Sequence, residues 1–176
     1  SEGCDYAFGT VLAADDEHRH LAVLARVRPL TVATHGDLTF RYRGGEGRLK
    51  RGLLEMTLAT TAGEITVWGL HLKSRFTDNP DDPMSARRRA GEATAIRDFI
   101  LRRHSDAGSG RYLIVGDFND GRTSQAVRFM GRRGQTTIAE LLPALDSRGE
   151  SWTYAYRKED RYERVDHILV SPGLRP

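Results

Sequence analysis

The sequence predicts a single mixed α/β domain over residues 1–176. Short apolar or alternating segments of the kind that form strands occur in both halves of the chain, and segments with helical spacing lie between them. The chain is 39% hydrophobic over 176 residues, which is enough to bury one core of ordinary size. It contains no internal repeats or low-complexity tracts. These observations favour one layered α/β unit.

Four strands are predicted before the long helix, at residues 5–13, 21–27, 53–60 and 64–72. The last two alternate apolar and polar side chains on either side of Thr-Ala-Gly at 61–63, which is the pattern of a β-hairpin. The second strand of this hairpin carries His71 at its end.

A helix is predicted from an N-cap at Ser85 to about His104, because small and apolar residues recur at helical spacing and would pack on a sheet. Three arginines, 87–89, occupy its first turn. Helix N-termini attract anions, so a basic first turn is unfavourable unless an anion binds there. Arg88 is therefore a candidate substrate contact, as is Lys73 just after His71; plain surface charge is the alternative.

The remaining elements are shorter. We predict a strand at 112–115, a helix that begins at Thr123 or Ser124 and runs through Met130, a further helical turn at 137–142, and strands at 152–156 and 164–171. In the final strand Asp166 and His167 point to opposite faces, because side chains alternate in a strand. We therefore expect His167 to point away from Asp166.

The most informative motif is Gly-Asp-Phe-Asn-Asp at 116–120, which directly follows the apolar strand at 112–115. Alternation places Asp117 and Asn119 on one side and Phe118 on the other, where Phe118 can anchor the loop. A carboxylate can orient a water or hold a cation, and an amide N–H can stabilise charge on a phosphoryl oxygen. An ordinary turn explains the same residue types, since Asp and Asn favour turns.

Taken together with His71 and the segment Arg-Val-Asp-His at 164–167, this motif resembles the endonuclease/exonuclease/phosphatase superfamily. The resemblance implies that His71 contacts the scissile phosphate, that Asp117 orients or activates the attacking water, that Asn119 binds a non-bridging oxygen, and that Asp166 orients a histidine further along the chain. It also implies the superfamily fold, an α/β (α+β) four-layer sandwich of two packed mixed β-sheets flanked by helices.

The chain departs from the superfamily pattern at both ends. No Ser-Asp-His motif follows residue 171, and no apolar strand ending in Gln-Glu precedes residue 5. We therefore expect the fold to be incomplete at both ends. The resemblance implies Mg²⁺ or Mn²⁺ as cofactor, but its main ligands are not in this sequence and the metal-binding residues are unknown. Glu2 is the nearest acidic residue to the expected position, in a segment without a supporting strand.

Composition limits the function classes only partly. The net charge of +3 and a basic cluster at 41–51 fit a phosphate-ester substrate, including nucleic acid, although a solvated hairpin tip is the favoured explanation of the cluster. No run of about 18 apolar residues exists, so we expect no membrane span. Cys4 is the only cysteine, so no intrachain disulfide forms. Compartment and oligomeric state stay open.

We therefore predict divalent-metal-dependent hydrolysis of a phosphate ester, by a nuclease-like phosphodiesterase. One alternative is a catalytically silent phosphate-binding or interaction domain of the same fold. Another is a lipid phosphodiesterase similar to sphingomyelinases, for which Phe76 is the candidate contact. Trp152 is a candidate cleft aromatic by resemblance, and an ordinary half-exposed aromatic is the alternative.

Overall fold

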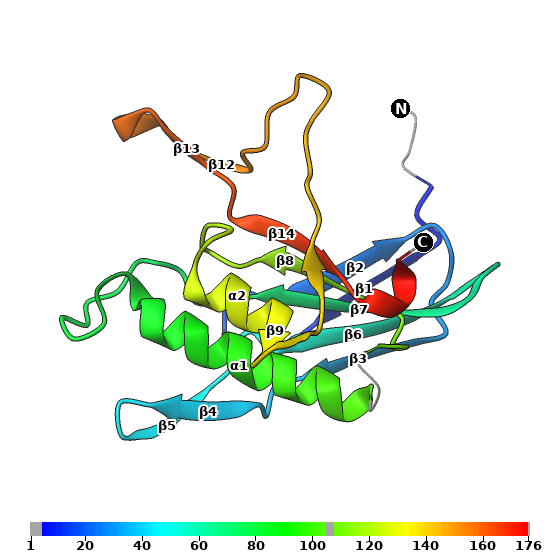
Figure 1. The fold of residues 1–176 in the computed structure, drawn as a ribbon, viewed down its shortest axis with the longest axis horizontal. Helices are drawn as coiled ribbons and strands as arrows, with labels where there is room; N and C mark the ends of the chain where they lie inside the picture. Colours follow the sequence, from blue (N-terminus) through cyan, green and yellow to red (C-terminus); the bar gives the residue numbers. More distant parts are fainter. Residues whose placement is uncertain (1–4, 105–107, 176) are drawn as a thin grey trace.

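The computed structural model describes residues 5–104 and 108–175, so Cys4 and Glu2 lie outside it. Its centre is a six-stranded mixed sheet (Figure 1). In spatial order the strands are β11 (Glu140–Leu141), β14 (Asp166–Val170), β8 (Tyr112–Asp117), β7 (Gly63–His71), β6 (Leu53–Thr60) and β3 (Thr31–His35). Within this sheet β7 and β8 pair in parallel, and the other neighbouring strands pair antiparallel. The long helix α1 (Ala86–Arg103) makes the crossover between them, as parallel pairing requires.

The other elements are short. Four two-stranded sheets are formed by β1 (Phe8–Leu12) with β2 (Leu21–Ala25), β4 (Thr39–Tyr42) with β5 (Gly45–Arg48), β9 (Arg132–Arg133) with β10 (Thr136–Thr137), and β12 (Tyr154–Tyr156) with β13 (Arg161–Glu163). Helix α2 spans Gln125–Gly131, and 3-10 turns occupy Pro83–Ser85, Arg157–Glu159 and Pro172–Leu174. In the described part of the chain, no helix is long and apolar enough to cross a membrane.

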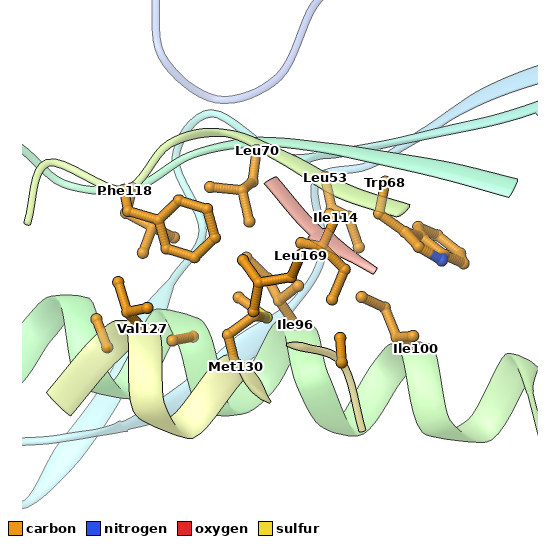
Figure 2. Close-up of a cluster of buried hydrophobic side chains, with 14 of the residues drawn as sticks. Leu53, Trp68, Leu70, Ile96, Ile100, Ile114, Phe118, Val127, Met130 and Leu169 are labelled. Carbon is orange, nitrogen blue, oxygen red and sulfur yellow. The ribbon is translucent and has the colours of Figure 1, made fainter. Parts of the chain in front are cut away.

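Helices α1 and α2 cover one face of the sheet and enclose the core (Figure 2). Alternate strand residues point into this core, among them Trp68 and Leu70 of β7 and Ile114 of β8. They meet the apolar side of α1, where Ile96 and Ile100 are fully buried. Each such side chain contributes about 1.5–3 kcal/mol relative to an exposed position. This packing fixes how each strand is rotated about its own axis. The side chains that alternate with the core residues therefore point to the opposite face of the sheet.

The hairpin β1–β2 contacts β7. Val23 of β2 is buried but does not belong to the cluster under the helices, which places this hairpin on the opposite face of the six-stranded sheet. Among the described residues, the predicted second sheet consists of this antiparallel pair. Its outer side carries exposed Val11 and Leu24. The predicted mixed α/β class is confirmed.

Most predicted elements are present within a few residues, but two local predictions are wrong. The segment 137–142 forms strands, not a helical turn, because Glu140 and Leu141 pair with the sheet edge at β14. Ser85 has a left-handed φ of 53° and makes no capping bond. The cap is Asp82, whose carboxylate accepts the N–H groups of Arg87 and Arg88 at 3.0 Å each. Burial disfavours ionisation of Asp82, yet these bonds hold its pKa below the usual range.

Candidate functional site

Three candidate residues lie side by side where the central strands end. In the parallel pair His71 lies opposite Asp117, and in the antiparallel pair Asp166 lies opposite Asp117. All three side chains alternate with core residues, so they point to the sheet face away from α1 and α2. Strand register therefore brings together groups that are far apart in the sequence.

The loop after β8 adds Asn119 to this group. Phe118 is fully buried in the core, as its alternation predicted, and it holds the loop in place. Asn119 has a left-handed φ of 51°, which Asn tolerates better than most residues. Its backbone N–H donates to Asp117 Oδ1 at 2.7 Å, and its amide nitrogen donates to the Leu72 carbonyl at 2.9 Å. The amide keeps a second N–H that this bond does not use.

His71 and Asp117 are in contact through their side chains, with 3.3 Å between His71 Nε2 and Asp117 Oδ2. Burial and the nearby cation of Arg51 lower the pKa of His71 from 6.5 to about 4, so the imidazole is neutral at pH 7. Burial raises the pKa of Asp117, and the charge of Asp166 adds to this rise. A carboxylate with a raised pKa is a better proton acceptor than a solvated one.

Gly116 allows the two central strands to approach at this point. Its φ of 138° is a conformation that side-chain-bearing residues rarely adopt, and a Cβ there would lie 2.0 Å from the Leu70 carbonyl oxygen. The position directly before Asp117 therefore requires glycine.

Arg51 is a site residue that sequence reasoning missed, because it was grouped with the exposed basic loop at 41–51. It is buried, and its Nη1 donates to the Leu72 carbonyl at 2.5 Å. Its Nε lies 3.5 Å from Asp16 Oδ2, so a carboxylate from the turn after β1 compensates the charge. The Leu72 carbonyl accepts from both Arg51 and Asn119. Leu49, two residues before Arg51, is also buried. In an extended segment residues two apart point to the same side, so the apolar Leu49 was the sequence signal that Arg51 also points inward.

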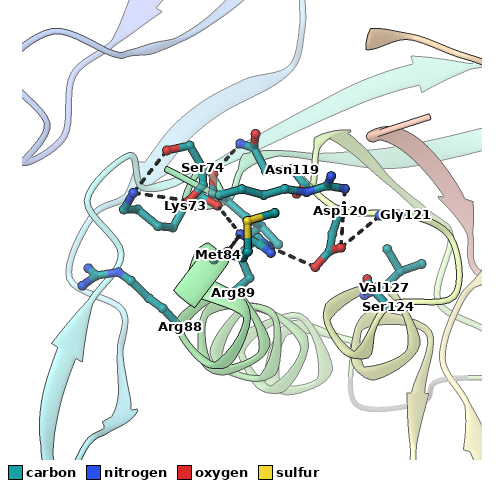
Figure 3. Close-up of polar contacts among 12 residues, drawn as sticks. Lys73, Ser74, Met84, Arg88, Arg89, Asn119, Asp120, Gly121, Ser124 and Val127 are labelled. Carbon is teal, nitrogen blue, oxygen red and sulfur yellow. Dashed lines mark hydrogen bonds and ion pairs between the residues drawn. The ribbon is translucent and has the colours of Figure 1, made fainter. Parts of the chain in front are cut away.

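Lys73 and Arg88 lie near His71, and together they line a small cavity of about 30 Å³. The Lys73 ammonium donates to Ser74 Oγ at 3.1 Å (Figure 3). Arg88 Nε lies 3.3 Å from Glu92 Oε1, and its guanidinium lies over the rings of Phe40 and Tyr42. Protein groups therefore already engage the polar ends of both candidates.

The basic first turn of α1 needs no external anion. Asp82 caps the backbone there, and the buried Arg89 pairs with Asp120 at 3.0 Å (Figure 3). Arg89 also donates to the carbonyls of Lys73 and Met84 at 3.2 and 2.6 Å. The chain therefore supplies carboxylates of its own to this turn, and the role of Arg88 as a substrate contact stays a prediction.

Trp152 lies on the Asp166 side of the site, and both residues line one hollow of about 360 Å³. The indole is 40% exposed, donates to Glu150 Oε2 at 2.8 Å, and packs against the ring of Tyr162. His167 is buried on the opposite face, with Nε2 2.8 Å from the Asp120 carbonyl, and so points away from Asp166 as expected.

A larger groove of about 800 Å³ opens beside Asp117 and Asn119. The loop between β7 and α1 forms one wall and the hairpin β12–β13 forms the other. Its larger side chains are Arg75, Phe76, Met84, Tyr154, Tyr156 and Arg161. Arg75 connects the walls, because it donates to the Asn119 carbonyl at 3.0 Å and pairs with Glu163 at 2.5 Å.

The described residues do not complete a metal site by themselves. Within residues 5–104 and 108–175, no group of three or more His, Cys, Asp or Glu side chains is placed to hold an ion. Strand pairing places Asp117 opposite Asp166, which brings two carboxylates together, whereas Mg²⁺ takes six oxygen ligands in near-octahedral geometry.

Comparison with known proteins supports the fold. The model of the Endonuclease/Exonuclease/phosphatase family matches residues 9–176. No curated protein sequence matches the chain. A Staphylococcus aureus beta toxin superimposes with a TM-score of 0.68 at 13% identity, over 97% of this chain and 65% of the toxin.

Two further structures have the same fold. Sphingomyelinase C from Streptomyces griseocarneus gives a TM-score of 0.65 at 18% identity, over 98% of this chain and 65% of the enzyme. The human nocturnin catalytic domain, solved with sulfate, gives a TM-score of 0.63 at 16% identity, over 93% of this chain and 60% of that domain. Another similar structure is a beta toxin mutant with bound magnesium ions. The chain thus spans less than two thirds of each of the first three structures.

Proposed function

Because this chain belongs to the endonuclease/exonuclease/phosphatase family, whose members typically hydrolyse phosphoesters, we propose that it hydrolyses phosphodiesters as a nuclease-like, divalent-metal-dependent enzyme. The observation that carries the proposal is the cross-strand register that brings His71, Asp117 and Asp166 together. The proposed substrate class is a phosphodiester.

The residues divide the chemistry between them. Asp117 accepts a proton from a water as the water oxygen attacks phosphorus, and the ester oxygen on the opposite side leaves. The neutral His71 and the free amide N–H of Asn119 donate to phosphoryl oxygens, where negative charge increases. Asp166 raises the proton affinity of Asp117 through its charge.

Family enzymes generally use divalent metals. A bound Mg²⁺ or Mn²⁺ ion acts as a Lewis acid on phosphoryl oxygen. Because the described carboxylates do not complete a metal site, the proposed proton transfer and hydrogen bonds involve only side chains of the protein. The dependence on metal is proposed from the family and is open to a direct test.

A silent phosphate-binding domain is the second candidate, and the incomplete metal site in the described residues favours it. Hydrolysis of bis(p-nitrophenyl) phosphate separates the two. We expect turnover with Mg²⁺, loss of turnover with EDTA, and rates lower by about 10²–10⁴-fold in Asp117→Asn. His71→Ala should also lower the rate, whereas Asp98→Asn on the outer surface of α1 is the charge-matched control. Equal rates in wild type, Asp117→Asn and His71→Ala would refute the enzyme and leave the silent domain.

A further inference from the structure

The groove beside Asp117 and Asn119 is positioned to receive the part of a diester beyond its phosphate. It begins at these two side chains and continues between the β7–α1 loop and the hairpin β12–β13. A phosphate held at Asp117 therefore directs one of its two ester arms into this groove. The chemistry of the walls then decides which arms are accepted.

One face of the hairpin supplies the aromatic wall. Tyr154 pairs with Glu163 and Tyr156 pairs with Arg161, so these four residues share a face. Ala155 pairs with Tyr162 on the other face. Both tyrosines of the first face line the groove, whereas Tyr162 does not.

The groove leaves unusually large apolar surfaces open to solvent. Phe76 is 80% exposed, Met84 is 50% exposed and Tyr154 is 45% exposed. The Arg161 guanidinium lies 5.6 Å from the Tyr156 ring centre, which forms a layered planar surface. Flat aromatic and guanidinium groups of this kind stack on a flat ring of a ligand.

The charges of the groove do not suit a long polyanion. Its two guanidinium groups, Arg75 and Arg161, face three carboxylates, Asp78, Asp117 and Glu159. Both arginines are already paired with Glu163. Binding a phosphate chain takes a row of cations that can displace counterions. The groove offers none beyond these paired arginines, so it fits one phosphate and an uncharged arm.

We propose that this groove is a binding site for an aromatic ring on one ester arm, and that it selects singly charged phosphodiesters with such an arm. A nucleobase is one ring of this kind. The inference rests on the proposed function for the position of the phosphate. The ring lies between Phe76 of the loop and Tyr154 and Tyr156 of the hairpin.

Titration calorimetry with diphenyl phosphate and dimethyl phosphate, each with Mg²⁺ present, tests the groove without requiring turnover. The two ligands carry the same charge and differ in the ring. We expect diphenyl phosphate to bind at least tenfold more tightly in the wild type. Tyr154→Ala should reduce this ratio at least threefold. If circular dichroism shows that Tyr154→Ala is unfolded, Phe76→Ala in the exposed loop takes its place and should reduce the ratio by the same factor.

Tyr162→Ala is the matched control, because it removes the same side chain from the opposite face of the same hairpin. It should leave the ratio unchanged. Equal binding of the two diesters, no detectable binding of diphenyl phosphate, or the same loss in Tyr162→Ala as in Tyr154→Ala would overturn the inference. A preference for diphenyl phosphate without hydrolysis of any diester would keep the groove and reject the proposed enzyme activity.

Discussion

Replacing Arg51 by alanine is expected to destabilise the fold by about 1.5–3 kcal/mol, because the buried guanidinium loses its ion pair with the half-buried Asp16 and a charged hydrogen bond. Two contacts contribute to this value. The guanidinium lies 3.5 Å from Asp16, whose side chain is only 13% exposed. It also donates to the Leu72 carbonyl, and a charged hydrogen bond of this kind contributes about 1.5–3 kcal/mol.

Urea denaturation of wild type, Arg51→Ala, Asp16→Ala and the double variant measures the coupling between the two residues. Arg19→Ala is the control, because Arg19 contacts the same carboxylate at 3.8 Å from an exposed position and should change stability by less than about 1 kcal/mol. In Arg51→Ala the pKa of His71, followed by NMR, should rise from about 4 towards 6.5, because a nearby cation is removed. If Arg51→Ala lowers the free energy of unfolding no more than Arg19→Ala does, the contacts of Arg51 with Asp16 and Leu72 do not stabilise the fold, and the reasoning fails.

Three further predictions concern single positions. Gly116→Ala places a Cβ 2.0 Å from the Leu70 carbonyl oxygen and should cost more than about 2 kcal/mol, measured as a lower Tm; an unchanged Tm would contradict the strand geometry. Asp82→Ala should cost about 0.5–2 kcal/mol through loss of the helix cap, whereas Asp81→Ala in the same loop should cost less. Because the pKa of His71 is about 4 in the folded state and 6.5 in the unfolded state, the unfolded chain binds more protons between these values. The contribution of His71 to the free energy of unfolding should therefore be complete above pH 6.5 and be lost as the pH decreases towards 4. The loss is at most about 3 kcal/mol, and less after solvent screening of the 30% exposed ring. Urea titrations across that pH range should show no such contribution in a His71→Gln variant.

Local patterns predicted those features that depend on neighbouring residues. Alternation along β8 correctly placed Phe118 in the core, and alternation along β14 correctly turned His167 away from Asp166. The juxtaposition of His71 with Asp117 depends on which strands pair, and resemblance to a known family supplied that information where periodicity could not. The roles of these residues stay predictions.

The failures have physical causes that residue spacing alone does not show. Residues 137–142 have apolar residues at helical spacing, but the open edge of β14 provides backbone partners and outweighs this local preference. The helix cap moved from Ser85 to Asp82 because Met84 and Ser85 both adopt left-handed conformations. The burial of Arg51 depends on Asp16, which is 35 positions earlier and belongs to another element.

The carbonyl oxygen of Leu72 accepts from donors in two different segments, Arg51 before β6 and Asn119 in the loop after β8. If Leu72 shifts with one of these segments, its hydrogen bond to the other segment weakens. An engineer who wishes to reshape the phosphate end of the groove therefore has to redesign both donors as a pair. The aromatic end is joined to the same loop, because Arg75 links Asn119 to Glu163 of the hairpin.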